Sequence, residues 1–446
     1  MRQLISFIFI LFLFGAKAQS STTNALSYYG LGERANGNHS IYDALGNNNF
    51  NYFDSSQLNF FNPASYCLMS TGNTLFSIGL QARESKYSYN GRSEYRLSAM
   101  ADHFALGFKM KKNMGLSFGL KPFSSRGYSF SQSISTGADS LKYTYSGKGG
   151  IEDLYLGFSL GIIQKKKTKF AIGANASYLF GTVSNERQAL LIDANTNSGG
   201  IGRQSIQMKA FHYELGTFFR QAIGKKQEIT LSVVFAPNQN LSASHLNEFY
   251  SATNVNTLST YDTLDYTKTK GQINYGVESK FGLAYQVILH DWKRKTRTLH
   301  PQLTVLASYT SFAGVSNTFD QVNSWNSLNS EKVGMGIQFT PEVKFYDNIS
   351  TLKALEKLNY RVGIYQNKLP YQTVSGNRYI EQGITFGLGM PIIAQQGLSS
   401  LNLAVTLGNR GVAEENTTKE SFIGLSFGLI VSPASFDRWF RKRKLD

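Results

Sequence analysis

The chain has 446 residues, with 45 Lys and Arg against 29 Asp and Glu, and a formal net charge of +16. Only 17% of the residues are charged, whereas about 25% is usual for a soluble domain. Aromatic residues make up 13%, which excludes a disordered chain, and the single cysteine excludes a disulfide scaffold. The 25 Tyr, 32 Phe and 41 Gly, with only 8 Pro, favour strands over helices.

Residues 1–18 have the order of a secretory signal peptide. Arg2 precedes an apolar run over residues 4–14, and small residues, Ala16 and Ala18, precede the expected cleavage site. The run is too short to cross a bilayer as a helix, which needs about 20 residues. No later stretch of 18 residues is apolar, so the exported chain is either soluble or enters a membrane as strands.

Apolar and polar residues alternate with a period of two in many segments. Between Leu401 and Leu407, for example, Leu and Val alternate with Asn, Ala and Thr, which places the apolar set on one face of a strand. We count fourteen such segments, near residues 73–85, 93–110, 114–123, 150–163, 168–183, 204–222, 227–237, 271–289, 300–313, 332–346, 357–366, 378–392, 399–408 and 420–432.

The connections between these segments alternate in length. Short ones, several of them rich in Lys, fall near 111–113, 164–167 and 223–226, and long polar ones fall at 124–149, 184–203 and 238–270. This rhythm is typical of outer-membrane barrels, and lipid admits strands only in a closed sheet. The sequence therefore predicts an all-β fold, a transmembrane antiparallel β-barrel of about 14 strands over residues 73–432. A soluble β-sandwich is the alternative.

An even strand count places both chain ends on the side of the short turns, which is the periplasmic side of the outer membrane of a Gram-negative bacterium. The basic tail over residues 433–446 would join the basic turns there, where outer-membrane lipid phosphates are the expected contact rather than nucleic acid. The sequence identifies no protein partner.

Residues 19–72 precede the first strand and do not alternate. Their aromatic side chains need burial, and a fourteen-stranded barrel has a lumen wide enough to need filling. We expect this segment to fold inside the barrel as a plug; a small periplasmic domain is the alternative. The candidate ligand path along the plug comprises Tyr28, Tyr29, Phe50, Tyr52, Phe53, Phe60 and Phe61.

One strand changes its phase at Asp102 and His103. Apolar residues are odd-numbered before this point and even-numbered after it, as a β-bulge would produce, so the two residues are a candidate irregularity of the wall. If the apolar faces meet lipid, a set of polar residues points into the lumen and would pair there or hold the plug. This candidate lumen network comprises Arg83, Arg96, Lys121, His212, Glu214, Arg220, Glu278, Lys280, Glu342, Lys344 and Arg361.

Asn62-Pro63-Ala64, placed just before the first strand, resembles the hatch motif of the outer-membrane long-chain fatty acid transporter family, a FadL-like resemblance. Later stretches, such as 119–128 and 383–391, are similar to the Bacteroidetes-type branch of that family. The resemblance implies a fourteen-stranded barrel with an N-terminal hatch and passive transport of hydrophobic or amphipathic molecules. Relatives with the same architecture serve type IX secretion, so an outer-membrane scaffold without transport activity is the alternative.

The sequence offers no catalytic constellation. Gly-x-Ser-x-Gly occurs at 115–119, 157–161 and 424–428, but each copy lies inside an alternating strand rather than at a strand-to-helix turn. We expect these small residues to line the lumen where the plug comes close. The six His show no metal-ligand spacing, so neither a catalytic residue, a metal nor a cofactor is expected, and the protein is predicted not to be an enzyme.

Overall fold

The computed structural model describes residues 24–35, 37–70, 74–135, 140–192, 199–252, 261–294, 297–317, 319, 325–343, 352–394, 397–414 and 417–432. The predicted signal peptide (1–18), the basic tail (433–446) and Lys344 lie outside these residues. No helix among the described residues is long and apolar enough to cross a membrane.

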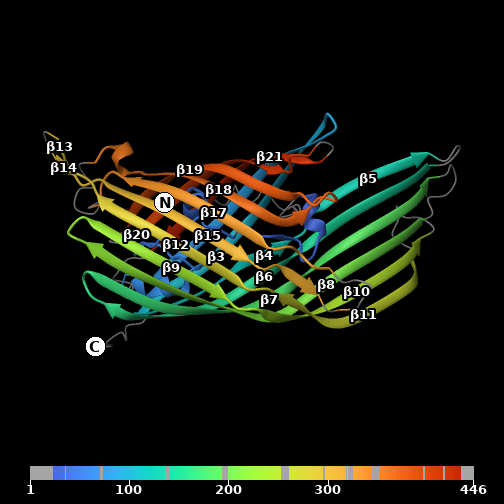
Figure 1. The fold of residues 1–446 in the computed structure, drawn as a ribbon, viewed down its shortest axis with the longest axis horizontal. Coiled ribbons are helices and arrows are strands. Elements are labelled where there is room, and N and C mark those ends of the chain that lie inside the picture. Colours follow the sequence, from blue (N-terminus) through green and yellow to red (C-terminus); the bar gives the residue numbers. More distant parts are fainter. Residues whose placement is uncertain are drawn as a thin grey trace, which may run out of the picture.

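Long antiparallel strands dominate the described chain (Figure 1). The strands are β1 (Glu33–Arg34), β2 (Thr74–Tyr89), β3 (Arg92–Lys111), β4 (Met114–Ser125), β5 (Tyr128–Ser135), β6 (Ser140–Gln164), β7 (Thr168–Ile192), β8 (Gly199–Ile223), β9 (Gln227–Ala236), β10 (Gln239–Ala252), β11 (Tyr261–Tyr275), β12 (Glu278–Ile288), β13 (Trp292–Arg294), β14 (Arg297–Leu299), β15 (Gln302–Phe312), β16 (Val315–Asn317), β17 (Ser330–Thr340), β18 (Asn359–Gln372), β19 (Arg378–Ala394), β20 (Gly397–Gly411) and β21 (Lys419–Val431). The helices are η1 (Ala25–Tyr28), α2 (Ser40–Asp43), η2 (Pro63–Leu68) and η3 (Ala354–Lys357).

Fourteen of these strands close into a barrel. The order around the wall is β2, β3, β4, β6, β7, β8, β9, β12, β15, β17, β18, β19, β20 and β21, and β21 pairs with β2 to complete the ring. Each pairing between neighbours is antiparallel. The predicted closed barrel and its strand number are therefore confirmed.

The apolar face of each barrel strand points outward. On β20, Leu403 is 50% exposed, whereas its neighbours Asn402 and Ala404 are buried. Leu425 on the adjacent β21 is 56% exposed. An outward band of this kind is stable in lipid, where apolar groups need no shielding, and it confirms the predicted assignment of the faces.

The three long polar connections expected at 124–149, 184–203 and 238–270 are mostly strands rather than loops, so that expectation was wrong. They form β5, the upper parts of β6, β7 and β8, and β10 with much of β11, which continue as a sheet beyond the barrel at the right of Figure 1. Its strands are rich in Ser, Thr, Asn and Gly and show little of the alternation that burial of one face imposes. We call this part the upper extension.

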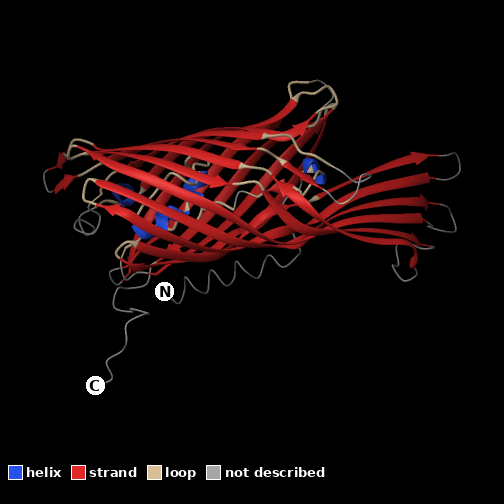
Figure 2. Cartoon of the chain, turned by 60° about the horizontal axis from the view of Figure 1, so that its bottom comes forward, coloured by secondary structure: helices blue, strands red, loops and turns tan. Residues whose placement is uncertain are grey.

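The segment before β2 lies inside the barrel, as the short helices in the lumen of Figure 2 show. Ile41, Leu45, Phe60 and Tyr66 of this plug are at most 1% exposed and share one apolar cluster with wall residues of several strands. Burial of this extent matches the interior of a soluble domain, so the plug is part of the folded core. The boundaries predicted for plug and barrel remain predictions.

Small wall residues make room for the plug. A Cβ atom added to Gly115 would overlap the carbonyl of Tyr66, and one added to Gly336 would overlap the carbonyl of Leu45. Gly157 and Gly428, from the other two Gly-x-Ser-x-Gly copies, similarly face Tyr66 and His39. Close packing against the plug therefore uses one glycine from each Gly-x-Ser-x-Gly copy, namely Gly115, Gly157 and Gly428.

The phase change at Asp102 is a β-bulge. Gly79 pairs with His103 and Leu80 pairs with Ala101, so Asp102 is the extra residue of β3, and Asp102 and His103 are both buried. The predicted irregularity of the wall is therefore present in the structure. Beyond it the ladder between β3 and β4 ends at Phe104 and Leu120.

Above that point, β4 pairs with the plug instead of with β3. Ser125 and Ser124 of β4 form ladder pairs with Glu33 and Arg34 of β1. The upper half of β3 therefore keeps its ladder with β2 on one side, whereas no described strand of the wall pairs with it on the other. We call this separation the β3–β4 seam.

Candidate functional site

A cavity of about 440 Å³ lies between the plug and the wall of the upper lumen. One part of its lining is aromatic and includes Tyr29, Phe61, Phe123, Phe312 and Trp325. Another part is charged and includes Arg34, Glu278, Lys280, Lys332, Glu381 and Arg410. An apolar pocket with a few placed charges is the usual form of a small-molecule site. We call it the central cavity.

Three smaller cavities adjoin the central one, and one of them, of about 170 Å³, shares Tyr29, Gly30 and Trp325 with it. A cavity of about 370 Å³ at the mouth is lined by aromatic residues of the plug, β2, β5, β6 and β19, and it shares Tyr29 and Arg410 with the central cavity. A cavity of about 70 Å³ lies at the β3–β4 seam, where Met100 and Ser125 line it, and it shares Glu33, Arg34 and Arg410 with the central cavity. The mouth and seam cavities also share Tyr87 and Glu420 with each other, so these two and the central cavity adjoin one another beside the plug.

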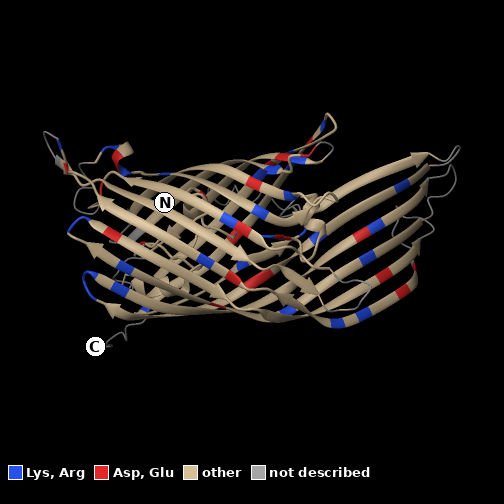
Figure 3. Ribbon diagram, viewed as in Figure 1, with Lys and Arg blue, Asp and Glu red and all other residues tan. Residues whose placement is uncertain are grey.

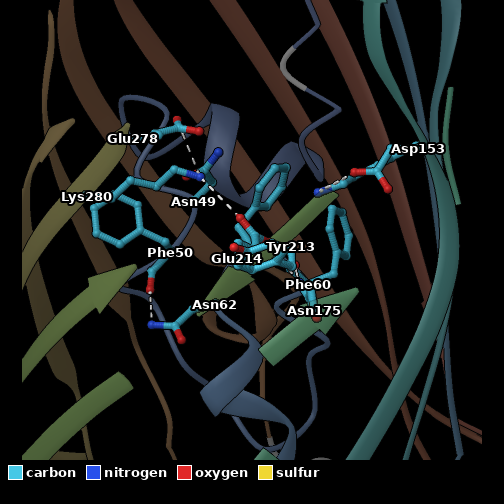
Figure 4. Close-up of polar contacts among 12 residues, drawn as sticks. Asn49, Phe50, Phe60, Asn62, Asp153, Asn175, Tyr213, Glu214, Glu278 and Lys280 are labelled. Atoms are coloured by element: carbon cyan, nitrogen blue, oxygen red, sulfur yellow. Dashed lines mark hydrogen bonds and ion pairs between the residues drawn. The ribbon is translucent and has the colours of Figure 1, made fainter. Parts of the chain in front are cut away.

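A chain of polar contacts crosses the floor of the central cavity (Figure 4). Arg34 of the plug donates two hydrogen bonds to Glu278, at 3.1 and 3.0 Å. Glu278 lies 3.6 Å from Lys280, and Lys280 lies 3.8 Å from Glu214. The amide of Asn175 then donates to Glu214 at 2.9 Å. The chain therefore links the plug to charges on β8 and β12.

The end of this chain returns to the plug. The hydroxyl of Tyr66 donates to the side-chain oxygen of Asn175 at 2.8 Å, and the amide nitrogen of Asn175 donates to the carbonyl of Phe60 at 3.1 Å. A buried Asn whose donors and acceptor are all used fixes its neighbours, because an unpaired buried polar group is costly.

A second cluster holds the start of the plug beside the seam. Arg410 contacts Glu33 of the plug and Glu381 of β19, and it lies 3.5 Å from Glu420. Arg83 also pairs with Glu420, at 2.8 Å. Burial alone would raise the pKa of Glu33, but Arg410 and Arg83 hold this pKa below its usual range. Glu33 is therefore an ionised tether of the plug to the wall.

Arg361 anchors the lower plug from the opposite wall. It donates to Gln338 at 2.7 Å and to Asn402 at 3.0 Å. Gln338 in turn donates to the hydroxyl of Tyr52 at 2.9 Å, and the hydroxyl of Ser40 donates to the carbonyl of Asn402 at 3.1 Å. Lumen charge here supports the plug rather than facing open water.

The Asn62-Pro63-Ala64 motif starts helix η2. The side-chain oxygen of Asn62 accepts from the amide of Ala64 at 3.1 Å, and Pro63 occupies the first turn. The side-chain amide nitrogen of Asn62 also donates to the backbone carbonyls of Phe50 and Thr217, at 3.1 and 3.3 Å. The motif therefore caps a helix and joins two parts of the plug to β8.

The aromatic residues of the candidate path divide into two groups. Tyr28, Tyr29 and Phe61 line at least one of the described cavities. The other four, Phe50, Tyr52, Phe53 and Phe60, line none of these cavities, and Phe50, Tyr52 and Phe60 are buried in the plug core. The structure thus places only the first group where a ligand fits.

Some residues of the candidate lumen network lie apart from the central cavity. Arg96 pairs with Glu94 of its own strand, and Arg220 near the lower end of β8 pairs with Glu228. The expectation that Glu342 lies on a strand facing the lumen was wrong, because β17 ends at Thr340 and Glu342 contacts His300 at 3.3 Å. This contact is between connections at the lower end of the barrel.

The remaining network residues point inward as expected. Lys121 lies 3.6 Å from Asp153 and 4.9 Å from the ring centre of Phe61. His212 is buried between the rings of Phe123 and Tyr275. Sequence reasoning missed Glu33, Arg34, Asn175, Trp325, Lys332, Glu381, Arg410 and Glu420. The alternation on their strands could have placed four of these residues on the lumen side: Lys332, Glu381, Arg410 and Glu420. The pairing of Glu33 and Arg34, by contrast, depends on how the plug folds.

Comparisons with known proteins agree with this architecture. The toluene transporter TbuX of Ralstonia pickettii is similar with a TM-score of 0.51 and 12% identity, over 88% of this chain and 97% of that one. A FadL homologue of Pseudomonas aeruginosa gives 0.51 and 10%, over 93% and 99%. The toluene transporter TodX of Pseudomonas putida gives 0.50 and 12%, over 91% and 99%. At such identities the likeness shows a shared fold.

No curated protein matches the sequence. The family model described as BamG, however, matches residues 1–446. Since this match covers the sequence from end to end, the chain belongs to the BamG family.

Proposed function

We propose that this protein is an outer-membrane channel for passive transport of hydrophobic or amphipathic small molecules. The observation that carries the proposal is the group of three adjoining cavities beside the plug, one of which lies at the β3–β4 seam. The similar structures named as toluene transporters and as a FadL homologue support the same use of this fold. The outward apolar band supports residence in the outer membrane, and the even number of barrel strands supports both termini on the periplasmic side.

The proposed exit is sideways, through the seam, rather than downward past the plug. Below the central cavity, Leu45, Phe60 and Tyr66 are fully buried against the wall. At the seam, by contrast, β1 is the one described strand that pairs with the β3-facing edge of upper β4, and its ladder has two residues. Release of β1 would join the central cavity to the bilayer, where an apolar ligand is already stable.

The lining of the cavities supports ligands with an apolar body and a small polar end. Tyr29, Phe61 and Trp325 offer apolar area, whereas Lys332 offers a cation at the same cavity. A fatty-acid-like ligand satisfies both parts of the lining. The stretches similar to the Bacteroidetes-type branch support assignment to that branch of relatives.

A disulfide across the seam tests the proposal. Glu33 and Ser125 are ladder partners, so Glu33→Cys with Ser125→Cys, in a Cys67→Ala background, would fix β1 to β4. We expect the oxidised protein in liposomes to lose most of its flux of labelled fatty acid, and reduction to restore it. The reduced double variant is the matched control, because it carries the same substitutions.

A folded protein without flux in either redox state would support a scaffold instead of a channel. Equal flux in both states would show that the ligand leaves by another route. Barrel folding is followed separately, as the change in gel mobility on heating, so a failure to fold is not read as a closed seam.

A further inference from the structure

Four exposed lysines form a band on the outer face of the upper extension. They are Lys148 on β6, Lys209 on β8 and Lys268 and Lys270 on β11. The ladder registers place them in three successive rows, which are Lys148–Ser184–Ser205–Leu246–Lys268, Gly150–Thr182–Gln207–Ser244–Lys270 and Glu152–Phe180–Lys209. Blue segments mark lysine and arginine on these strands at the right of Figure 3.

The band begins directly above a row of partly or fully exposed aromatic residues on β7 and β8. The lowest row, which holds Lys209, is one pleat above the row of Tyr178 and Phe211, whose rings lie 5.3 Å apart. Phe211 is 78% exposed, and Leu154, Tyr213 and Leu215 continue the exposed apolar surface around and below it. Aromatic girdles of this kind mark the boundary between hydrocarbon and headgroups, so the lysines lie at headgroup level.

Most of the positive charge of the band has no partner among the described residues. Among the described residues, no ion pair involves the ammonium group of Lys148, Lys209, Lys268 or Lys270. Glu152 is the single acidic residue in the three rows. Four cations against one anion leave a surface that attracts anionic groups.

The next row above shows that the same sheet can pair its charges. Arg203 lies 2.9 Å from Glu186 and 3.7 Å from Glu248, its two ladder partners. That row, further from the membrane, holds two carboxylates against one guanidinium, and Lys148 of the adjacent row also attracts Glu186. Lys209, Lys268 and Lys270 form no ion pair among the described residues, which indicates that their partner comes from outside the chain.

We infer that the band binds the phosphorylated headgroup of a glycolipid in the outer leaflet, which in this membrane is lipopolysaccharide. Lysine ammonium groups suit phosphates as point charges. Thr182, Gln207 and Ser244, in the row of Lys270, add hydroxyl and amide groups that suit sugar hydroxyls. Strand and pleat spacings place Lys209 about 12 Å from Lys270, so one headgroup with two phosphates can reach both.

The inference rests on the outer-membrane orientation in the proposed function, but not on transport itself. The test compares binding of diphosphorylated lipid A, dephosphorylated lipid A and phosphatidylglycerol to the full-length protein in detergent, by native mass spectrometry. The variant is Lys209→Gln with Lys268→Gln and Lys270→Gln. The control changes Lys165, Lys166 and Lys167 to Gln, three exposed lysines of the short β6–β7 turn at the other end of the barrel.

We expect the variant to bind diphosphorylated lipid A about tenfold more weakly or worse, and the control to bind as the wild type does. The wild type should prefer lipid A with its phosphates over both other lipids. Equal binding of phosphatidylglycerol, or equal weakening in the control, would overturn the inference. If the variant does not fold, the inference is tested by the wild type alone, which should bind diphosphorylated lipid A more tightly than dephosphorylated lipid A.

Flux of labelled fatty acid in liposomes without glycolipid keeps the two proposals apart. The lysine variant should retain this flux, because its substitutions lie on the outer face of the extension and line none of the cavities on the proposed route. Loss of lipid A binding with normal flux supports the inference, whereas absent flux in a wild-type protein that binds lipid A counts only against transport.

Discussion

The lower and upper halves of the lumen differ in what fills them. In the lower half, wall glycines such as Gly115 and Gly336 allow the plug to approach the backbone of the wall, and large side chains such as Tyr66 are fully buried. In the upper half, the plug touches the wall through ion pairs of Glu33 and Arg34, and cavities separate them. A tightly packed region resists opening, whereas a contact made of a few ion pairs beside a cavity has less packed area to separate. Movement of the plug would therefore open a path in the upper half of the lumen rather than in the lower half.

The largest expected effect tests the wall that both halves share. On β20, Val405 faces lipid and its neighbour Thr406 faces the lumen side. Val405→Arg should destabilise the barrel by about 2–4 kcal/mol, because an arginine at the lipid-facing midplane loses its hydration. Thr406→Arg is the matched control and should cost less, since its charge stays out of the hydrocarbon. Denaturant titration of the protein in vesicles measures both, and similar losses would contradict the assigned faces.

The next largest effect is expected from a substitution that disrupts the packing between plug and wall in the lower half alone. A Cβ atom at Gly115 would overlap the backbone of Tyr66, so Gly115→Ala should destabilise plug docking by about 1–3 kcal/mol. Gly424 has the same motif context, but the nearest atom to a Cβ there is 3.5 Å away, so Gly424→Ala should be nearly neutral. The temperature at which gel mobility changes on heating compares the two. If this temperature fell less for Gly115→Ala than for Gly424→Ala, the plug would not be packed against β4.

The two halves also differ in how far sequence reasoning reaches. The barrel strands were predictable, because one lipid-facing side imposes a period of two on residues such as those between Leu401 and Leu407. The change of phase at Asp102 was visible for the same reason. The upper extension was not predicted as strands, because its residues are mostly polar and carry no clear alternation. The ion pair between Glu33 and Arg410 joins residues 377 apart, which no local pattern reveals.

The smallest effect sharpens the assignment of the upper half as a ligand cavity. Lys332 lines the central cavity, 5.9 Å from the ring centre of Tyr365, and no described ion pair includes it. A carboxylate headgroup there would gain about 1 kcal/mol, so Lys332→Gln should weaken fatty acid binding about fivefold. The matching fatty alcohol, which lacks the charge, should bind both forms alike. Trp325 lines the same cavity, so quenching of its fluorescence by brominated forms of the two ligands measures both affinities, with Trp325→Phe identifying the signal. Equal weakening for acid and alcohol would show that Lys332 shapes the cavity without reading the charge of the ligand, because a pure loss of packing acts on the shared tail.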